Sequence, residues 1–118
     1  MPRTPGDWRY SAGSGQTRAS YGAGETVFAI TCDLSSRAIT LARAGSGPSA
    51  MRIRTESSER TLSATSCETS VAATLTARDP LLDAMAFSKG RFAVETTGLA
   101  PLYLPSWVEV SRVLEDCR

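Results

Sequence analysis

Apolar and polar residues alternate along most of this chain. Between residues 8 and 94, short runs rich in Val, Ile, Thr and aromatic residues follow a period of two, as in TVFAITC (26–32) and AMRIR (50–54). This period is typical of β-strands with one buried face. Clusters of turn-forming residues separate about eight such runs, and ESSE (56–59) is expected to join two of them as a hairpin.

Two segments have a helical spacing instead. In DPLLDAMAF (79–87), Asp79 is a plausible N-cap and Pro80 occupies the first helical position, where its missing N–H has no cost. Gly90 is expected to end this short helix. Its predicted buried face consists of Leu81, Leu82, Met85 and Ala86.

A second helix is predicted at the end of the chain. Ser106 and Glu109 have the S-x-x-E spacing of a capping box, so the helix is expected to start at Ser106. An apolar stripe follows, which should pack the helix on the sheet and turn Cys117 inward. The stripe consists of Trp107, Val110, Val113, Leu114 and Cys117.

These elements predict a mainly β fold. We expect an antiparallel β-sandwich or a partly open barrel with one short mid-chain helix and a C-terminal helix. Residues 1–7 look like a linker, and residues 8–118 are expected to form a single β-rich domain. The length of 118 residues is sufficient for one hydrophobic core.

Composition and charge narrow the possible functions. The net charge is +1, so we expect no nucleic-acid partner. The chain has no histidine, which removes the commonest general base and metal ligand, and we predict no metal, no cofactor and no enzymatic activity. No apolar run is long enough to span a bilayer, and the start MPRTPGDW has none of the features of a signal peptide.

Residues 79–118, together with ASYG (19–22) and FAITCD (28–33), resemble small envelope proteins of alphaproteobacteria, a family of lipoproteins and secreted proteins without an assigned activity. The segment from Cys67 to Val94 is also similar to that of invasion-associated locus B-like periplasmic proteins. These resemblances imply a periplasmic or envelope-anchored location, and they imply no particular chemistry.

The chain has three cysteines, Cys32, Cys67 and Cys117. Two arrangements fit the residues: isolated buried thiols, or one disulfide with one thiol left over. In the second, Cys32 in a core-like strand would pair with Cys117 on the packing face of the last helix, closing a loop of roughly 85 residues worth about 4 kcal/mol. The resemblance to envelope proteins favours this disulfide. We expect Cys67 to stay free, and without a histidine to activate it a nucleophilic role is not predicted.

One basic cluster is a candidate contact for an anion or an acidic partner. Alternation places Arg52 and Arg54 on one face of a strand, and the hairpin would bring Arg60 nearby. The alternative is a solvated outer face on which Glu56 and Glu59 neighbour the arginines.

Tyr103 is the other candidate contact. It alternates away from Leu102 and Leu104, so its ring is expected on the exposed side of a strand, where an aromatic residue can anchor a partner. The function that fits these features is a non-catalytic cell-envelope β-domain that binds an unknown protein or envelope component. The alternative is a small-molecule carrier or sensor that uses a β-barrel cavity. An enzyme built on Cys67 or Asp83 is the third possibility.

Overall fold

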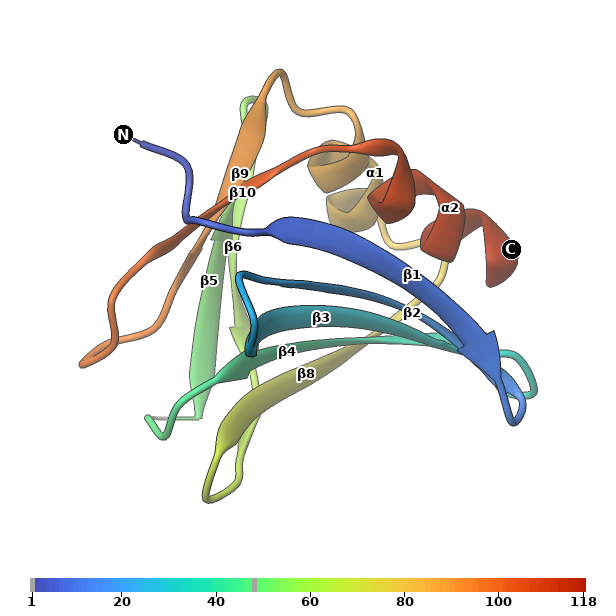
Figure 1. The fold of residues 1–118 in the computed structure, drawn as a ribbon, viewed down its shortest axis with the longest axis horizontal. Helices are drawn as coiled ribbons and strands as arrows, with labels where there is room; N and C mark the ends of the chain where they lie inside the picture. Colours follow the sequence, from blue (N-terminus) through green and yellow to red (C-terminus); the bar gives the residue numbers. More distant parts are fainter. Residues whose placement is uncertain (1, 48) are drawn as a thin grey trace.

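The protein is built from two antiparallel β-sheets and two helices (Figure 1). The computed structural model describes residues 2–47 and 49–118. The strands and helices are β1 Asp7–Gly13, β2 Gln16–Gly22, β3 Thr26–Asp33, β4 Ala38–Ala44, β5 Ala50–Arg54, β6 Glu59–Ser63, β7 Thr65–Ser66, β8 Ser70–Thr76, α1 Pro80–Ala86, β9 Arg91–Glu95, β10 Leu102–Pro105 and α2 Val108–Asp116.

The sheets confirm the predicted fold class. The six-stranded sheet has the order β1-β2-β3-β4-β8-β7, and the four-stranded sheet has the order β10-β9-β5-β6. β6 ends at Ser63 in one sheet and β7 begins at Thr65 in the other, so the chain passes between the sheets at this corner. The strands do not close into a barrel.

The core lies between the sheets and the helices. Alternate residues of the strands are buried there, and four aromatic rings meet edge to face. Trp8 lies 5.1 Å from Tyr21 and 6.4 Å from Phe28, and Phe28 lies 6.2 Å from Phe92, measured between ring centroids. The interior is therefore filled by side chains, and the surface grooves described below lie outside it.

Helix α1 starts as predicted, but it ends at Ala86 rather than at Gly90, and Ala86 is only half-buried. The Asp79 carboxylate accepts a hydrogen bond of 2.9 Å from the Leu81 N–H, and Pro80 follows at the first helical position. Leu81, Leu82 and Met85 are buried against the core.

Helix α2 differs from the prediction at its start. The predicted capping box is wrong, because Trp107 and not Ser106 occupies the N-cap position. The Ser106 hydroxyl instead donates to the Met85 carbonyl at 2.7 Å. The helix begins at Val108 after Trp107, and no side chain caps it. Trp107 was expected in the buried stripe, but it is 36% exposed because it precedes the first helical turn. Val110, Val113 and Leu114 are buried as expected.

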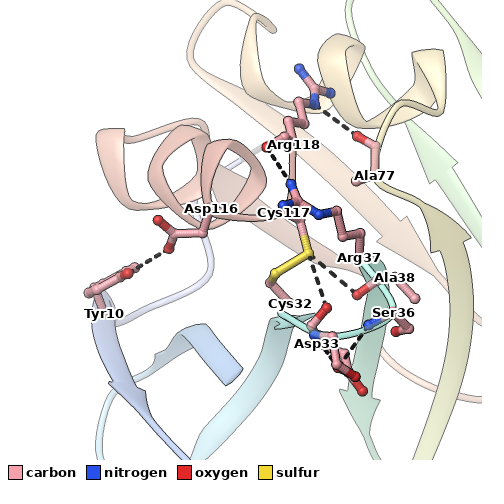
Figure 2. Close-up of a disulfide and its surroundings, with 11 residues drawn as sticks. Tyr10, Cys32, Asp33, Ser36, Arg37, Ala38, Ala77, Asp116, Cys117 and Arg118 are labelled. Atoms are coloured by element: carbon pink, nitrogen blue, oxygen red, sulfur yellow. Dashed lines mark hydrogen bonds between the residues drawn. A yellow bond between two sulfur atoms is a disulfide. The ribbon is translucent and has the colours of Figure 1, made fainter. Parts of the chain in front are cut away.

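The other end of α2 is fixed to the six-stranded sheet by a disulfide. Cys117 is joined to Cys32 of β3, with the two Cα atoms 5.7 Å apart (Figure 2). On one side of the disulfide, the Tyr10 hydroxyl donates to the Asp116 carboxylate at 2.5 Å, a hydrogen bond that raises the pKa of Tyr10. On the other side, Arg118 donates to the Ala77 carbonyl at 2.8 Å.

The predicted disulfide is thus present, and Cys67 is a free, exposed thiol. Disulfides persist in oxidising compartments, so the bond is compatible with a location outside the cytoplasm. Within residues 2–47 and 49–118, neither helix has the length and apolar character needed to cross a bilayer.

The segment before β1 packs on the domain. Thr4 exchanges hydrogen bonds with the Tyr103 backbone at 2.8 and 2.9 Å, and its carbonyl accepts from the Tyr21 hydroxyl at 2.7 Å. Asp7, the last residue of the predicted linker, already belongs to β1. Residue 1 of that predicted linker lies outside the described residues.

Candidate functional site

The outer face of the four-stranded sheet gathers most of the predicted contact residues. Because Met51 and Ile53 of β5 point into the core, Arg52 and Arg54 between and after them point outward. Arg54 lies opposite Ala93 of β9, which in turn lies opposite Tyr103 of β10. Tyr103 lies on the same face as the two arginines, where it is half-buried rather than fully exposed.

Two carboxylates neutralise these arginines. The closest contact joins Arg52 Nη2 to Glu59 Oε1 at 2.7 Å, and Arg54 Nη1 lies 3.3 Å from Glu95 Oε2. The two remaining contacts, Arg52 to Glu95 at 3.8 Å and Arg54 to Glu59 at 3.5 Å, close the ring. We call these four residues the charged network. It is balanced in charge and partly exposed, so it contributes little to stability but displays both donors and acceptors.

Arg60 does not belong to this network. It lies opposite the buried Ile53 in the β5–β6 pair, so its side chain is on the core side of the sheet. There Arg60 Nη2 contacts Asp79 Oδ2 at 2.7 Å, and this hydrogen bond lowers the pKa of Asp79. The hairpin therefore brings Arg60 next to β5 but on the opposite face, where it supports the start of α1.

Two grooves adjoin the charged network along the strands. The first has a volume of about 450 Å³ and extends from Arg52 and Glu95 to the β9–β10 loop. The second has a volume of about 590 Å³ and extends from Arg54 to the turn after α1. The first is lined by Ala50, Arg52, Thr61, Glu95, Thr96, Thr97, Gly98, Leu99 and Pro101, and the second by Arg54, Thr55, Glu56, Lys89, Arg91, Phe92, Ala93 and Tyr103.

The loop that borders the first groove is held by a buried arginine and a glycine. Arg43 is 5% exposed and donates to the Ala100 carbonyl at 3.0 Å, and burial lowers the pKa of its guanidinium. A Cβ at Gly45 would lie 3.1 Å from the Leu99 side chain. In the same loop, the Thr96 hydroxyl is buried without a hydrogen-bond partner. The close approach of this loop to the six-stranded sheet shapes the groove.

A serine bridge forms the border of the second groove. Ser88 Oγ donates to the Arg91 carbonyl and accepts from the Glu56 N–H, both at 3.0 Å. The Glu56 carboxylate accepts from the Lys89 N–H at 3.1 Å. These bonds join the β5–β6 turn to the turn after α1, so Ser88 has a structural role.

The site presents several groups that can bind a polar partner. Guanidinium donors, carboxylate acceptors, threonine hydroxyls and the Tyr103 ring share one face. Among the described residues, no three Cys, Asp or Glu side chains are grouped so that they could hold a metal ion. Sequence reasoning did not identify Glu95 as a partner of the arginines, although its alternation with the buried Phe92 and Val94 places it outward.

Comparisons with known proteins add no further information. No protein-family model, no curated protein sequence and no solved structure matches the chain.

Proposed function

We propose that this chain is a non-catalytic binding domain of the bacterial cell envelope, periplasmic or envelope-anchored, that holds a macromolecular partner or envelope component on the outer face of its four-stranded sheet. The observation that carries the proposal is the charged network between two grooves, with Tyr103 beside the second. The disulfide supports a location in an oxidising compartment.

The shape of the face favours an elongated, polar partner. One groove begins at Ala50 and Arg52 and the other at Arg54, so together they follow β5 from end to end. A partner lying along β5 would exchange hydrogen bonds with guanidinium and carboxylate groups and pack against Tyr103. Because the network is balanced in charge, recognition would depend on paired donors and acceptors rather than on a strong net charge.

A small-molecule carrier has less support from the structure. Its predicted site was a barrel cavity, but the strands do not close into a barrel, and Tyr21, Phe28 and Phe92 fill the interior. Native mass spectrometry of the purified protein tests this alternative directly, because a carrier would retain a ligand of defined mass.

The proposal is tested by affinity capture from an envelope extract with the immobilised protein. Tyr103→Ala and Arg54→Glu are expected to weaken recovery of a specific component at least about tenfold, the size of effect typical of a central aromatic or charged contact. Arg9→Glu and Thr40→Ala, exposed or half-exposed on the six-stranded sheet, serve as matched controls and should leave recovery unchanged. Recovery that is equal for all four variants would contradict the assignment of this face.

A further inference from the structure

Exposed apolar side chains are concentrated at one corner of the molecule. Among the described residues, four large apolar side chains are exposed, and three of them are Phe87 (79%), Val108 (74%) and Trp107 (36%). The fourth, Leu34 (43%), lies in the β3–β4 turn. We call Phe87, Trp107 and Val108 the apolar corner. Exposed apolar residues that gather in this way mark a contact surface rather than ordinary surface composition.

The corner joins two segments that are distant in sequence. The Ser106 N–H donates to the Gly90 carbonyl at 3.0 Å, and the Ser106 hydroxyl donates to the Met85 carbonyl at 2.7 Å. These bonds hold the turn that contains Phe87 beside the start of α2, where Trp107 and Val108 follow. Both segments lie on the upper side of the molecule in Figure 1.

Basic residues surround the apolar corner. The Arg3 guanidinium lies 5.1 Å from the centre of the Trp107 ring, and Lys89 and Arg91 follow Phe87 closely. Residues 2–4, 87–91 and 105–109 carry three basic residues and one acidic residue, Glu109. The Glu56 carboxylate also reaches this region, where it accepts from the Lys89 N–H at 3.1 Å. The exposed apolar side chains therefore have more basic than acidic neighbours.

We propose that the apolar corner docks the protein on an anionic membrane surface. Aromatic and aliphatic side chains would enter the interface, and Arg3 and Lys89 would contact the lipid phosphates. A lipid surface is favoured over a protein partner because the cationic side chains of Arg3 and Lys89 accompany the exposed apolar ones, a combination that suits an anionic membrane interface. The three apolar side chains lie outside the proposed partner face, although Lys89 also lines its second groove.

The test is flotation of the purified full chain with lipid vesicles. The wild-type protein is expected to float with vesicles that contain roughly one third phosphatidylglycerol, and much less with vesicles of phosphatidylcholine alone. The double variant Phe87→Ala/Val108→Ala should lower the partition coefficient at least about thirtyfold, because it removes roughly 2 kcal/mol of apolar transfer free energy. Lys89→Glu should lower it about fivefold or more, and only at low salt.

Matched controls separate this contact from general effects. Leu34→Ala removes an exposed apolar side chain elsewhere, and Arg9→Glu reverses an exposed charge elsewhere, and both should float like the wild type. Tyr103→Ala should also float normally, so that failure of the partner face and failure of the membrane contact are distinguishable. Tryptophan emission should shift to the blue on vesicle binding in the wild type and not in Trp107→Phe, since Trp8 is already buried.

Three results would overturn the proposal. The first is the absence of flotation with either vesicle, and the second is flotation that persists unchanged in Phe87→Ala/Val108→Ala. The third is self-association in analytical ultracentrifugation that this double variant abolishes while vesicles are not bound, since that result would assign the apolar corner to a contact between two copies of the chain.

Discussion

Breaking the Cys32–Cys117 disulfide should destabilise the entire domain. The bond joins residues 85 positions apart, so in the unfolded state it restricts a loop that includes most of the chain. The chain-entropy relation gives a loss of about 15 cal/mol/K for this loop, which corresponds to roughly 4.5 kcal/mol at room temperature. A domain of this size is typically stable by about 5–15 kcal/mol, so the bond supplies a large share of the total.

The assay is urea unfolding of the Cys67→Ser variant, which prevents reshuffling with the free thiol. The oxidised protein is compared with the reduced protein and with Cys32→Ala/Cys117→Ala. With an m value of about 1.5 kcal/mol/M, the midpoint should fall by roughly 3 M on reduction. The double alanine variant should be less stable than the reduced protein, because both sulfurs are buried and their loss leaves small cavities.

Hydrogen exchange distinguishes this explanation from a local one. If the bond acts on the unfolded chain, the most protected amides of β3 and β4 should lose protection together with those of α2 on reduction. A loss of less than about 1 kcal/mol, with exchange increased only in residues 108–116, would refute the reasoning. The hydrogen bond from Tyr10 to Asp116 and the contacts of Arg118 would then be what fixes the helix end.

Three further predictions concern the supports of the fold. Asp79→Ala should cost about 1–2 kcal/mol in urea unfolding because it removes the α1 cap, whereas Asp79→Asn keeps an acceptor and should cost less than about 0.5 kcal/mol. Folding lowers the pKa of Asp79, mainly through the hydrogen bond from Arg60. Folding also lowers the pKa of Asp33, whose carboxylate accepts from backbone N–H groups of the β3–β4 turn. The contribution of the two carboxylates to the free energy of unfolding is therefore present above the unfolded-state pKa of about 3.9 and is lost as the pH falls below it. When unfolding is monitored from pH ~6 to ~3, the Asp79→Asn/Asp33→Asn variant should lose less stability than the wild type. Gly45→Ala should cost more than Gly24→Ala, because both have positive φ angles but only the Cβ at Gly45 would press on the β9–β10 loop, and equal thermal shifts for the two would contradict this.

The fold could be predicted because its main determinants are local. Alternation identifies strands such as β3 and β5, and the cap and proline of α1 lie within the helix they start. β2 is less evident, because Thr17 and Ala19, two of its three inward residues, are polar or small. It forms a strand because β1 and β3 pair with it on both sides.

The features that sequence reasoning missed depend on tertiary contacts. Ser106 has the spacing of a cap, but the helix begins one residue later than that spacing requires, and the Ser106 hydroxyl donates to the Met85 carbonyl of another element. The position of Arg60 was open to prediction, since it lies two residues before the buried Leu62 and therefore shares its face. The neutralisation of Arg52 and Arg54 could not be predicted from the sequence, because Glu95 reaches them only when β9 pairs with β5.

The two ends of α2 connect the stability of the domain to its proposed contacts. The helix covers the core beside β1, β2 and β3, its last turn is fixed by the disulfide, and its first turn presents Val108. A helix of nine residues is about 14 Å long, so a helix fixed at Cys117 holds the apolar corner at a set distance from the six-stranded sheet. Because the interior is filled, the surfaces left for binding are outside, on the four-stranded sheet and at this corner. Reduction of the disulfide should leave vesicle binding unchanged as long as the protein stays folded, since the bonds of Ser106 to Met85 and Gly90 still hold Trp107 and Val108 beside Phe87.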